Sequence, residues 1–299
     1  MEYALHLLII FEIWALLAVG LDLMAGRLGV VTLAHAGYFA IGAYGYAIPT
    51  VALGWSGVAC IMVGVGTATL LAAAVAVAAD RLKRDFLVLA TLALQVTIYF
   101  VIILWARADA PLASWTNLTN GSQGIAHIPR PEAFGAPLEM EAAFALFSTL
   151  VVMPFILLVW AIDRSPWARR ATAIRDDELA LRALGKDPRQ TRIEAAVVSA
   201  AAAAIAGALF AAYAGYVDPS IGALEQSVLM LAMVVIGGLG SMRGALTGAA
   251  VVVGLPEILR FLRLPEGQAA PVRMMLFGAL LVLLIHLRPA GLAGRYRLS

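Results

Sequence analysis

Charge and cysteine are scarce in this chain of 299 residues. Only 13% of its residues are charged, whereas 62% are hydrophobic, and a soluble domain typically holds about 25% charged residues. The single cysteine, Cys60, lies in an apolar run, so an intrachain disulfide is excluded and a buried structural thiol is favoured. The net charge of +2, with no basic patch interleaved with aromatic residues, argues against a nucleic-acid partner. Water is therefore not the main solvent of this chain.

The motifs of nucleotide hydrolysis and metal binding are also missing. There is no GxxxxGK[ST] phosphate loop, because the only Gly-Lys pair, Gly185-Lys186, is followed by Asp187 and lacks the upstream glycine. We therefore expect no ATP hydrolysis by this chain. GxSxG, HExxH and CxxC patterns are absent as well, so the sequence predicts neither an intramembrane enzyme nor a metal site.

Apolar runs of about twenty residues fill most of the chain, which is the length that a helix needs to cross ~30 Å of hydrocarbon. They lack the alternation of a membrane β-barrel. The sequence therefore predicts an all-α polytopic membrane protein with one transmembrane domain over residues 1–299. We expect about nine spans, with eight to ten compatible, at 4–24, 33–48, 56–79, 86–106, 141–162, 193–215, 225–240, 244–260 and 273–287. The short, Gly-rich spans among them are candidates for broken or re-entrant helices.

The distribution of Lys and Arg predicts the orientation of these spans. The connections at 80–85, 163–192 and 288–299 are rich in Lys and Arg. All three follow odd-numbered spans, so they fall on one side, which we expect to be the cytoplasm. The long connection at 107–140 is expected outside. The N-terminus is then external and the C-terminus cytoplasmic.

Small residues recur at helical spacing in several spans. Two stripes consist of Ala36, Ala40, Ala43 and Ala47, and of Ala200, Ala204, Ala208 and Ala212. Close helix packing is the favoured interpretation, although smooth surfaces that slide during transport remain an alternative. Gly240, Gly244 and Gly248 also follow a GxxxG pattern, for which a tight cytoplasmic turn between two spans is favoured.

Ionisable or amide side chains interrupt the apolar spans at a few scattered positions. For each, a structural partner or an interfacial position is favoured over a role in transport, and both remain open. The positions are Glu12, Asp22, His35, Gln95, Glu225, Glu257 and His286.

Residues 171–192 form an island of mixed charge within the otherwise apolar chain. The acidic run from Asp176 to Glu178 suits a helix N-terminus, while Gly185 and Pro188 are signals for a helix end. The predicted helix has two to three turns and is too short to be stable alone in water. It must therefore dock, either on the membrane surface or its own protein, or in a groove on a cytoplasmic partner.

Several stretches of the sequence resemble the branched-chain amino acid family of ABC-transporter permeases. AIRDDELALRALG followed by RIEAAVVSAAAAAIAGALFA is similar to that family's cytoplasmic loop and next span, and residues 22–47 to its early Gly-x-x-Ser-Leu-Gly-His-Ala motif. TNGSQGI at 119–125 resembles the external stretch of its M-type subunit, and residues 232–260 and 273–294 its closing blocks. Thr32, Ala34 and Ala290 depart from the family pattern, which leaves the substrate more open than the fold.

The resemblance implies a type II-like ABC importer permease in the bacterial inner membrane, for branched-chain or other hydrophobic amino acids. Urea, amides and aromatic acids are alternative substrates, and a stand-alone ion-coupled secondary transporter is the alternative function. The implied partners are a second homologous permease, two cytoplasmic ATPase subunits that bind ATP and Mg²⁺, a periplasmic substrate-binding protein and membrane lipid. No cofactor is expected in this chain itself.

The resemblance also suggests two groups of functional residues. The helix within 163–192 is identified as the coupling helix, which fits a groove on the ATPase and transmits its movement. Its expected residues are Arg175, Asp176, Asp177, Glu178, Ala180, Arg182, Leu184 and Gly185. The second group is expected near the translocation path or its external mouth, and consists of Glu12, Thr32, His35, Tyr38, Thr119, Gly121, Ser122 and Gly124.

Overall fold

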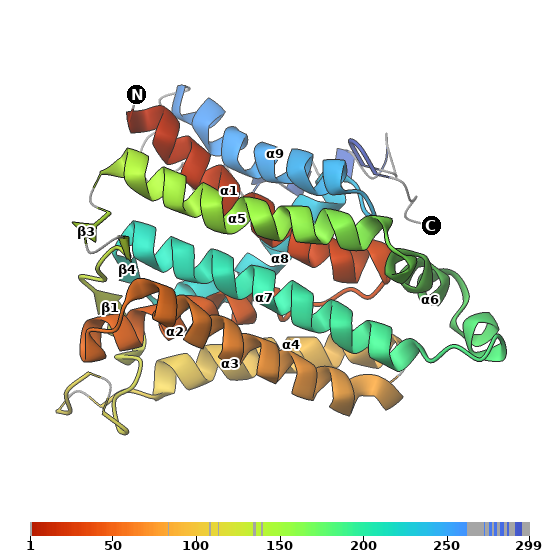
Figure 1. The fold of residues 1–299 in the computed structure, drawn as a ribbon, viewed down its shortest axis with the longest axis horizontal. Helices are drawn as coiled ribbons and strands as arrows, with labels where there is room; N and C mark the ends of the chain where they lie inside the picture. Colours follow the sequence, from red (N-terminus) through yellow and green to blue (C-terminus); the bar gives the residue numbers. More distant parts are fainter. Residues whose placement is uncertain are drawn as a thin grey trace.

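The computed structural model describes residues 2–261 except 83, 108, 113, 134–135 and 139, together with 272, 275–276, 278–279, 282–283, 286 and 291–294. Within these residues the chain is built from helices that lie side by side, joined by turns and by strands of two residues (Figure 1). The predicted all-α class is confirmed.

Five helices in the described part are long and apolar enough to cross a membrane. They confirm the predicted spans at 4–24, 56–79, 86–106, 141–162 and 193–215. The first of them continues into a π-helical turn, η1 (Leu23–Arg27). Their bounds are α1 (Glu2–Asp22), α3 (Gly57–Ala78), α4 (Arg84–Leu104), α5 (Glu141–Arg164) and α7 (Pro188–Ala214).

Three further helices correspond to the short predicted spans. They are α2 (His35–Leu53), α8 (Leu224–Gly237) and α9 (Met242–Phe261). At 14 residues, α8 is about 21 Å long and is too short to cross the hydrocarbon alone. The ninth predicted span, 273–287, falls mostly outside the described residues.

The remaining elements lie at the two ends of the helices. At one end β1 (Ile125–Ala126) pairs antiparallel with β4 (Tyr216–Val217), so that Ile125 lies opposite Val217. At the opposite end α6 (Pro166–Ala183) projects beyond the other helices (Figure 1). The other short elements are η2 (Ala79–Arg81), η3 (Gly121–Gln123), β2 (Glu132–Ala133), β3 (Ala136–Pro137) and η4 (Pro219–Gly222).

The small-residue stripes are packing surfaces between α2, α3 and α7. A Cβ atom added to Gly207 would lie 1.9 Å from the carbonyl oxygen of Phe39, and one added to Gly42 would lie 2.1 Å from that of Ala204. Both stripes are buried to within 1% of full burial. Lipid provides no hydrophobic force between helices, so this close contact supplies the van der Waals attraction that holds α2 in place.

A tight turn joins α8 to α9, as the sequence predicts. Gly238 and Gly240 have φ values of 110° and 75°, a region that glycine adopts without steric cost. Gly244 and Gly248 then pack α9 against α8, since a Cβ added to Gly248 would lie 2.1 Å from the carbonyl oxygen of Met233. The GxxxG pattern therefore serves both the turn and the helix contact.

We expect Gly207→Ala to destabilise the protein, because the added Cβ meets backbone that cannot rotate away and α2 must separate from α7. Such overpacking costs about 1–3 kcal/mol and should lower the midpoint of thermal unfolding in detergent by several degrees. Gly66→Ala is the matched control: Gly66 lies in α3 with nothing within 4 Å of an added Cβ. Equal unfolding midpoints for the two variants would contradict this account of the stripe.

Candidate functional site

A non-helical segment, residues Leu28–Ala34, separates η1 from α2. Several of its backbone groups are hydrogen-bonded within the protein: the Val30 N–H donates to the Met24 carbonyl at 2.9 Å and the Leu33 N–H to the Thr91 hydroxyl at 3.2 Å. Irregular backbone at membrane depth is tolerated only where the protein satisfies such groups. The irregular segment therefore lies in the predicted connection between the spans 4–24 and 33–48, whereas the short span 33–48 itself falls within the continuous helix α2 apart from its first two residues.

Gln95, in the middle of α4, binds the beginning of α2 to the turn before α8. Its side chain is fully buried. The Gly37 N–H donates to Oε1 of Gln95 at 2.6 Å, and the Gln95 amide donates to the carbonyl of Gly222. One amide thus satisfies two backbone groups that no helix hydrogen bond satisfies.

Ser227, in the first turn of α8, joins the same place from the other side. Its hydroxyl donates to the Leu33 carbonyl at 2.5 Å and accepts from the Ala36 N–H at 3.2 Å. The beginnings of α2 and α8 therefore meet through Gln95 and Ser227, and we call this contact the junction. The sequence marks Gln95 as a polar residue within a span, but no local pattern identifies its partners.

Three of the expected pathway residues gather beside the junction. Thr32 and Tyr38 line a cavity that is also lined by Ser199. His35 is 1% exposed, with Nε2 at 3.2 Å from the Leu17 carbonyl and Nδ1 at 3.5 Å from the Ser199 hydroxyl. Because a carbonyl only accepts, Nε2 of His35 carries the proton.

Glu12 lies apart from these residues, in the contact between α1 and α5. Its two carboxylate oxygens accept from the hydroxyls of Ser148 and Thr149, each at 2.5 Å. These contacts agree with the favoured prediction from the sequence, in which Glu12 has structural partners, because a carboxylate within a span needs hydrogen-bond donors.

The expected residues at 119–124 lie at the end of the molecule that carries the strands. The Thr119 hydroxyl donates to the Ile102 carbonyl at 2.6 Å, near the end of α4. Gly121 and Gly124 have φ values of 54° and 69°, and a Cβ added to Gly124 would lie 2.3 Å from the Val217 carbonyl. Ser122 is exposed. The structure thus divides the expected pathway residues among three places.

Buried charges hold η1 in place, and this cluster is not among the contacts predicted from the sequence. Arg27 forms an ion pair with Asp163 of α5, with 2.5 Å between Nη2 and Oδ1. Asp22 accepts from the Gly240 N–H in the α8–α9 turn at 2.7 Å. The available signal was a lone Arg and a lone Asp at the same predicted end of two spans, because opposite charges within a membrane tend to pair.

The charged island at 171–192 is a broken helix followed by a turn. At Asp177 the backbone of α6 leaves the helical region, with φ −155° and ψ 100°, and the Asp177 carboxylate accepts from the Ala180 N–H at 3.0 Å. This N-cap begins a second limb that ends at Ala183. The limb is shorter than the two to three turns expected, because Asp177 caps it rather than lying inside it. Gly185, with φ 72°, confirms the predicted helix end.

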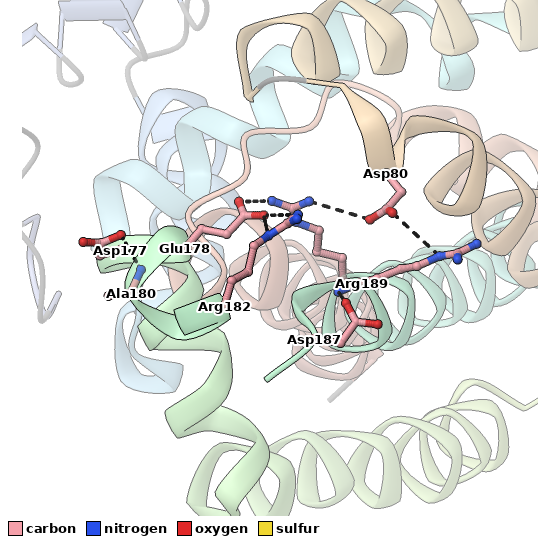
Figure 2. Close-up of polar contacts among 8 residues, drawn as sticks. Asp80, Asp177, Glu178, Ala180, Arg182, Asp187 and Arg189 are labelled. Carbon is pink, nitrogen blue, oxygen red and sulfur yellow. Dashed lines mark hydrogen bonds and ion pairs between the residues drawn. The ribbon is translucent and has the colours of Figure 1, made fainter. Parts of the chain in front are cut away.

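Four of the charged side chains of this region form ion pairs within the chain (Figure 2). Glu178 pairs with Arg182 at 2.9 Å and also with Arg192 of α7. Asp80, at the end of α3, lies 3.7 Å from Arg189 and 3.8 Å from Arg192. The network fastens the second limb of α6 to α7 and α3.

Apolar side chains, by contrast, face outward on the second limb. Leu179 and Leu184 are 79% and 78% exposed, and Ala180 and Ala183 are exposed beside them. We call these four residues the apolar tip of α6. Asp176 is exposed next to the tip, and Arg175 is half-buried against its own chain. An exposed apolar patch at the end of a charged segment is typical of an interaction surface.

Among the described residues, no group of three or more His, Cys, Asp or Glu side chains is placed to hold a metal ion.

Comparison with known proteins gives a family match over nearly the whole chain. The family described as branched-chain amino acid transport system / permease component matches residues 3–285. The high-affinity branched-chain amino acid transport system permease protein LivM of Escherichia coli is 29% identical over 94% of this chain and 67% of LivM. LivH of the same system and organism is 27% identical over 94% of this chain and 91% of LivH.

A more distant similarity involves another cargo. The autoinducer 2 import system permease protein LsrC of Klebsiella pneumoniae is 32% identical over 42% of this chain and 39% of LsrC. No solved structure matches this chain.

We expect Gln95→Leu to loosen the junction, because it leaves the Gly37 N–H and the Gly222 carbonyl without partners. A buried unsatisfied group costs about 1–3 kcal/mol, so hydrogen exchange of residues 33–37 should accelerate by at least tenfold. Thr97→Val is the control, since the exposed Thr97 hydroxyl donates only within α4, to Ala93. Unchanged exchange in Gln95→Leu would contradict the role of Gln95.

Proposed function

The chain belongs to the permease components of the branched-chain amino acid transport system, and we propose that it is the membrane subunit of an importer for branched-chain or other hydrophobic amino acids. As a permease subunit of an ABC transporter it is a multi-pass membrane protein and not an enzyme. The substrate part of the proposal rests on the similarity to LivM and LivH. The match to LsrC shows that this similarity extends to a permease of a different cargo.

The proposed assembly contains this chain, a second homologous permease, two cytoplasmic ATPase subunits and a periplasmic binding protein, in the bacterial inner membrane. ATP and Mg²⁺ are held by the ATPase subunits. The end that carries α6 faces the cytoplasm in this proposal, and so does the C-terminus by the Lys and Arg distribution of the sequence. The support for this orientation is that Asp80 contacts Arg189 and Arg192, so two Lys/Arg-rich connections lie together, while the strands lie at the opposite end (Figure 1).

The single observation that carries the driven mechanism is the apolar tip of α6. Leu179 and Leu184 are exposed on a limb whose Glu178 and Arg182 pair with each other, with Glu178 also bound to α7. We infer that the tip docks in a groove on an ATPase subunit, and that apolar contact supplies the affinity while the paired charges fix the angle of the limb. We therefore keep the proposal that this part of α6 is the coupling helix, and we assign its contact with the ATPase to the apolar tip rather than to the charged residues.

ATP binding closes the ATPase dimer and moves both coupling helices in this proposal. The helices of the two permeases then alternate between outward and inward openings. Thr32, His35 and Tyr38 beside the junction are placed where a gate would act, and residues 119–124 at the external mouth. No covalent chemistry occurs in this chain.

Reconstitution tests the proposed function. We expect proteoliposomes that hold the chain with its three proposed partner subunits and the binding protein to accumulate radiolabelled leucine only when ATP is supplied. ATPase subunits that lack the phosphate-loop lysine are the control and should abolish uptake. Accumulation by the chain alone, driven by an ion gradient, would instead support a secondary transporter.

Docking through the tip is tested by the double substitution Leu179→Ser and Leu184→Ser. Each buried Leu contributes about 1.5–3 kcal/mol, so affinity for the ATPase subunits should fall roughly tenfold to a hundredfold per residue. Binding is measured by titrating labelled ATPase subunits onto the permease pair in detergent. Lys186→Ser, in the exposed turn that follows, should bind as the wild type does. Wild-type affinity in the double variant would refute docking through the tip.

A further inference from the structure

A second buried cluster, apart from the main core, joins both limbs of α6 to the non-helical segment, and Leu181 is its member from the second limb. It brings together side chains from α6, from η1 and the start of Leu28–Ala34, and from α7. Its members are Met24, Leu28, Val30, Ala171, Ile174, Leu181 and Ala195. A displacement of α6 therefore also displaces η1 and the adjoining residues Leu28 and Val30, because close-packed side chains transmit strain.

Arg175 adds a polar link at the same place. It lies in the first limb, two residues before the break at Asp177. Its guanidinium donates to the carbonyl of Gly26 in η1. Its stem lies across Gly29, where an added Cβ would be 2.6 Å from Cγ of Arg175. Gly29 has φ 71°. Glycine at this position therefore adopts the left-handed backbone conformation without strain and leaves room for the stem of Arg175.

The other contacts of η1 lead to different elements. Arg27 binds Asp163 of α5, and Asp22 binds Gly240 of the α8–α9 turn. Arg175 thus supplies a hydrogen bond from α6 to η1, while Arg27 and the adjacent Asp22 bind this turn to α5 and to the α8–α9 turn. Beyond Gly29, the chain reaches His35 and the junction within six residues.

We propose that Arg175 is a positioning residue that transmits the movement of α6 to the segment Leu28–Ala34, and through it to the junction. This rests on the proposed function, in which an ATPase subunit moves α6. Arg175 acts inside the permease, whereas the apolar tip on the other side of the break acts on the ATPase. The break at Asp177 lies between Arg175 and the apolar tip, and Leu181 of the second limb packs in the same buried cluster as the first limb.

The test follows the segment directly in the full complex. Val31, which is 38% exposed, is replaced by Val31→Cys in a Cys60→Ala background, so that the reporter is the single thiol of the chain. Its rate of reaction with a water-soluble maleimide is measured without nucleotide and with a non-hydrolysable ATP analogue, and leucine uptake per ATP hydrolysed is measured in proteoliposomes.

With Arg175 present, we expect the labelling rate to change at least threefold on adding the analogue. In Arg175→Met this change should disappear and uptake per ATP should fall at least tenfold, while ATP hydrolysis and assembly of the complex persist. Gly29→Ala, which displaces the stem but keeps the guanidinium, should reproduce the loss. Arg169→Met is the control, because Arg169 lies exposed on the same limb, and it should retain both values.

Retention of the labelling change and of the uptake ratio in both Arg175→Met and Gly29→Ala would overturn the proposal, since a merely structural role leaves them unaffected. A reporter complex that transports leucine without any nucleotide-dependent change in labelling would also overturn it, because the segment then does not move. A reporter complex with no ATP-dependent uptake while Arg175 is intact refutes the proposed function instead.

Discussion

A peptide group inside a bilayer must find its hydrogen-bond partner within the protein, because lipid offers none. This requirement governs the break between η1 and α2. In the segment Leu28–Ala34 the N–H and the carbonyl of Leu33 are bound by the hydroxyls of Thr91 and Ser227, and Gln95 binds the free N–H of Gly37 in the first turn of α2. The polar side chains within these spans thus make the non-helical segment possible, because they bind backbone groups that a helix would otherwise satisfy.

The small residues follow from the same environment. Helices in lipid gain nothing from hiding apolar surface from water, so contact depends on close approach of their backbones. Gly42 and Gly207 bring α2 against α7 so closely that a Cβ at either position would collide with backbone. Such packing fixes the direction in which α2 leaves the junction, which lets hydrogen bonds as local as those of Gln95 and Ser227 define where the helix begins.

The sequence predicted the spans well, because hydropathy and length are local properties, and it predicted the helix end at Gly185 for the same reason. It did not give the contacts that depend on tertiary partners. Glu178 and Arg182 were expected to face an ATPase, but they pair with each other and Glu178 with Arg192, contacts that no local spacing fixes. Glu12 was grouped with His35, although the structure places it against α5. The roles of these residues in transport stay predictions.

The distribution of bond types indicates which parts of the fold are able to move. Within α1 and α7 each turn is held by repeated backbone hydrogen bonds, and a sharp bend there requires breaking several at once. At the junction, single side-chain hydrogen bonds join the elements, and each has a net value of only about 1 kcal/mol. A hydroxyl such as that of Ser227 exchanges one carbonyl for another at little cost. The helices therefore form a frame, and under the proposed function the movement of α6 is absorbed at the break.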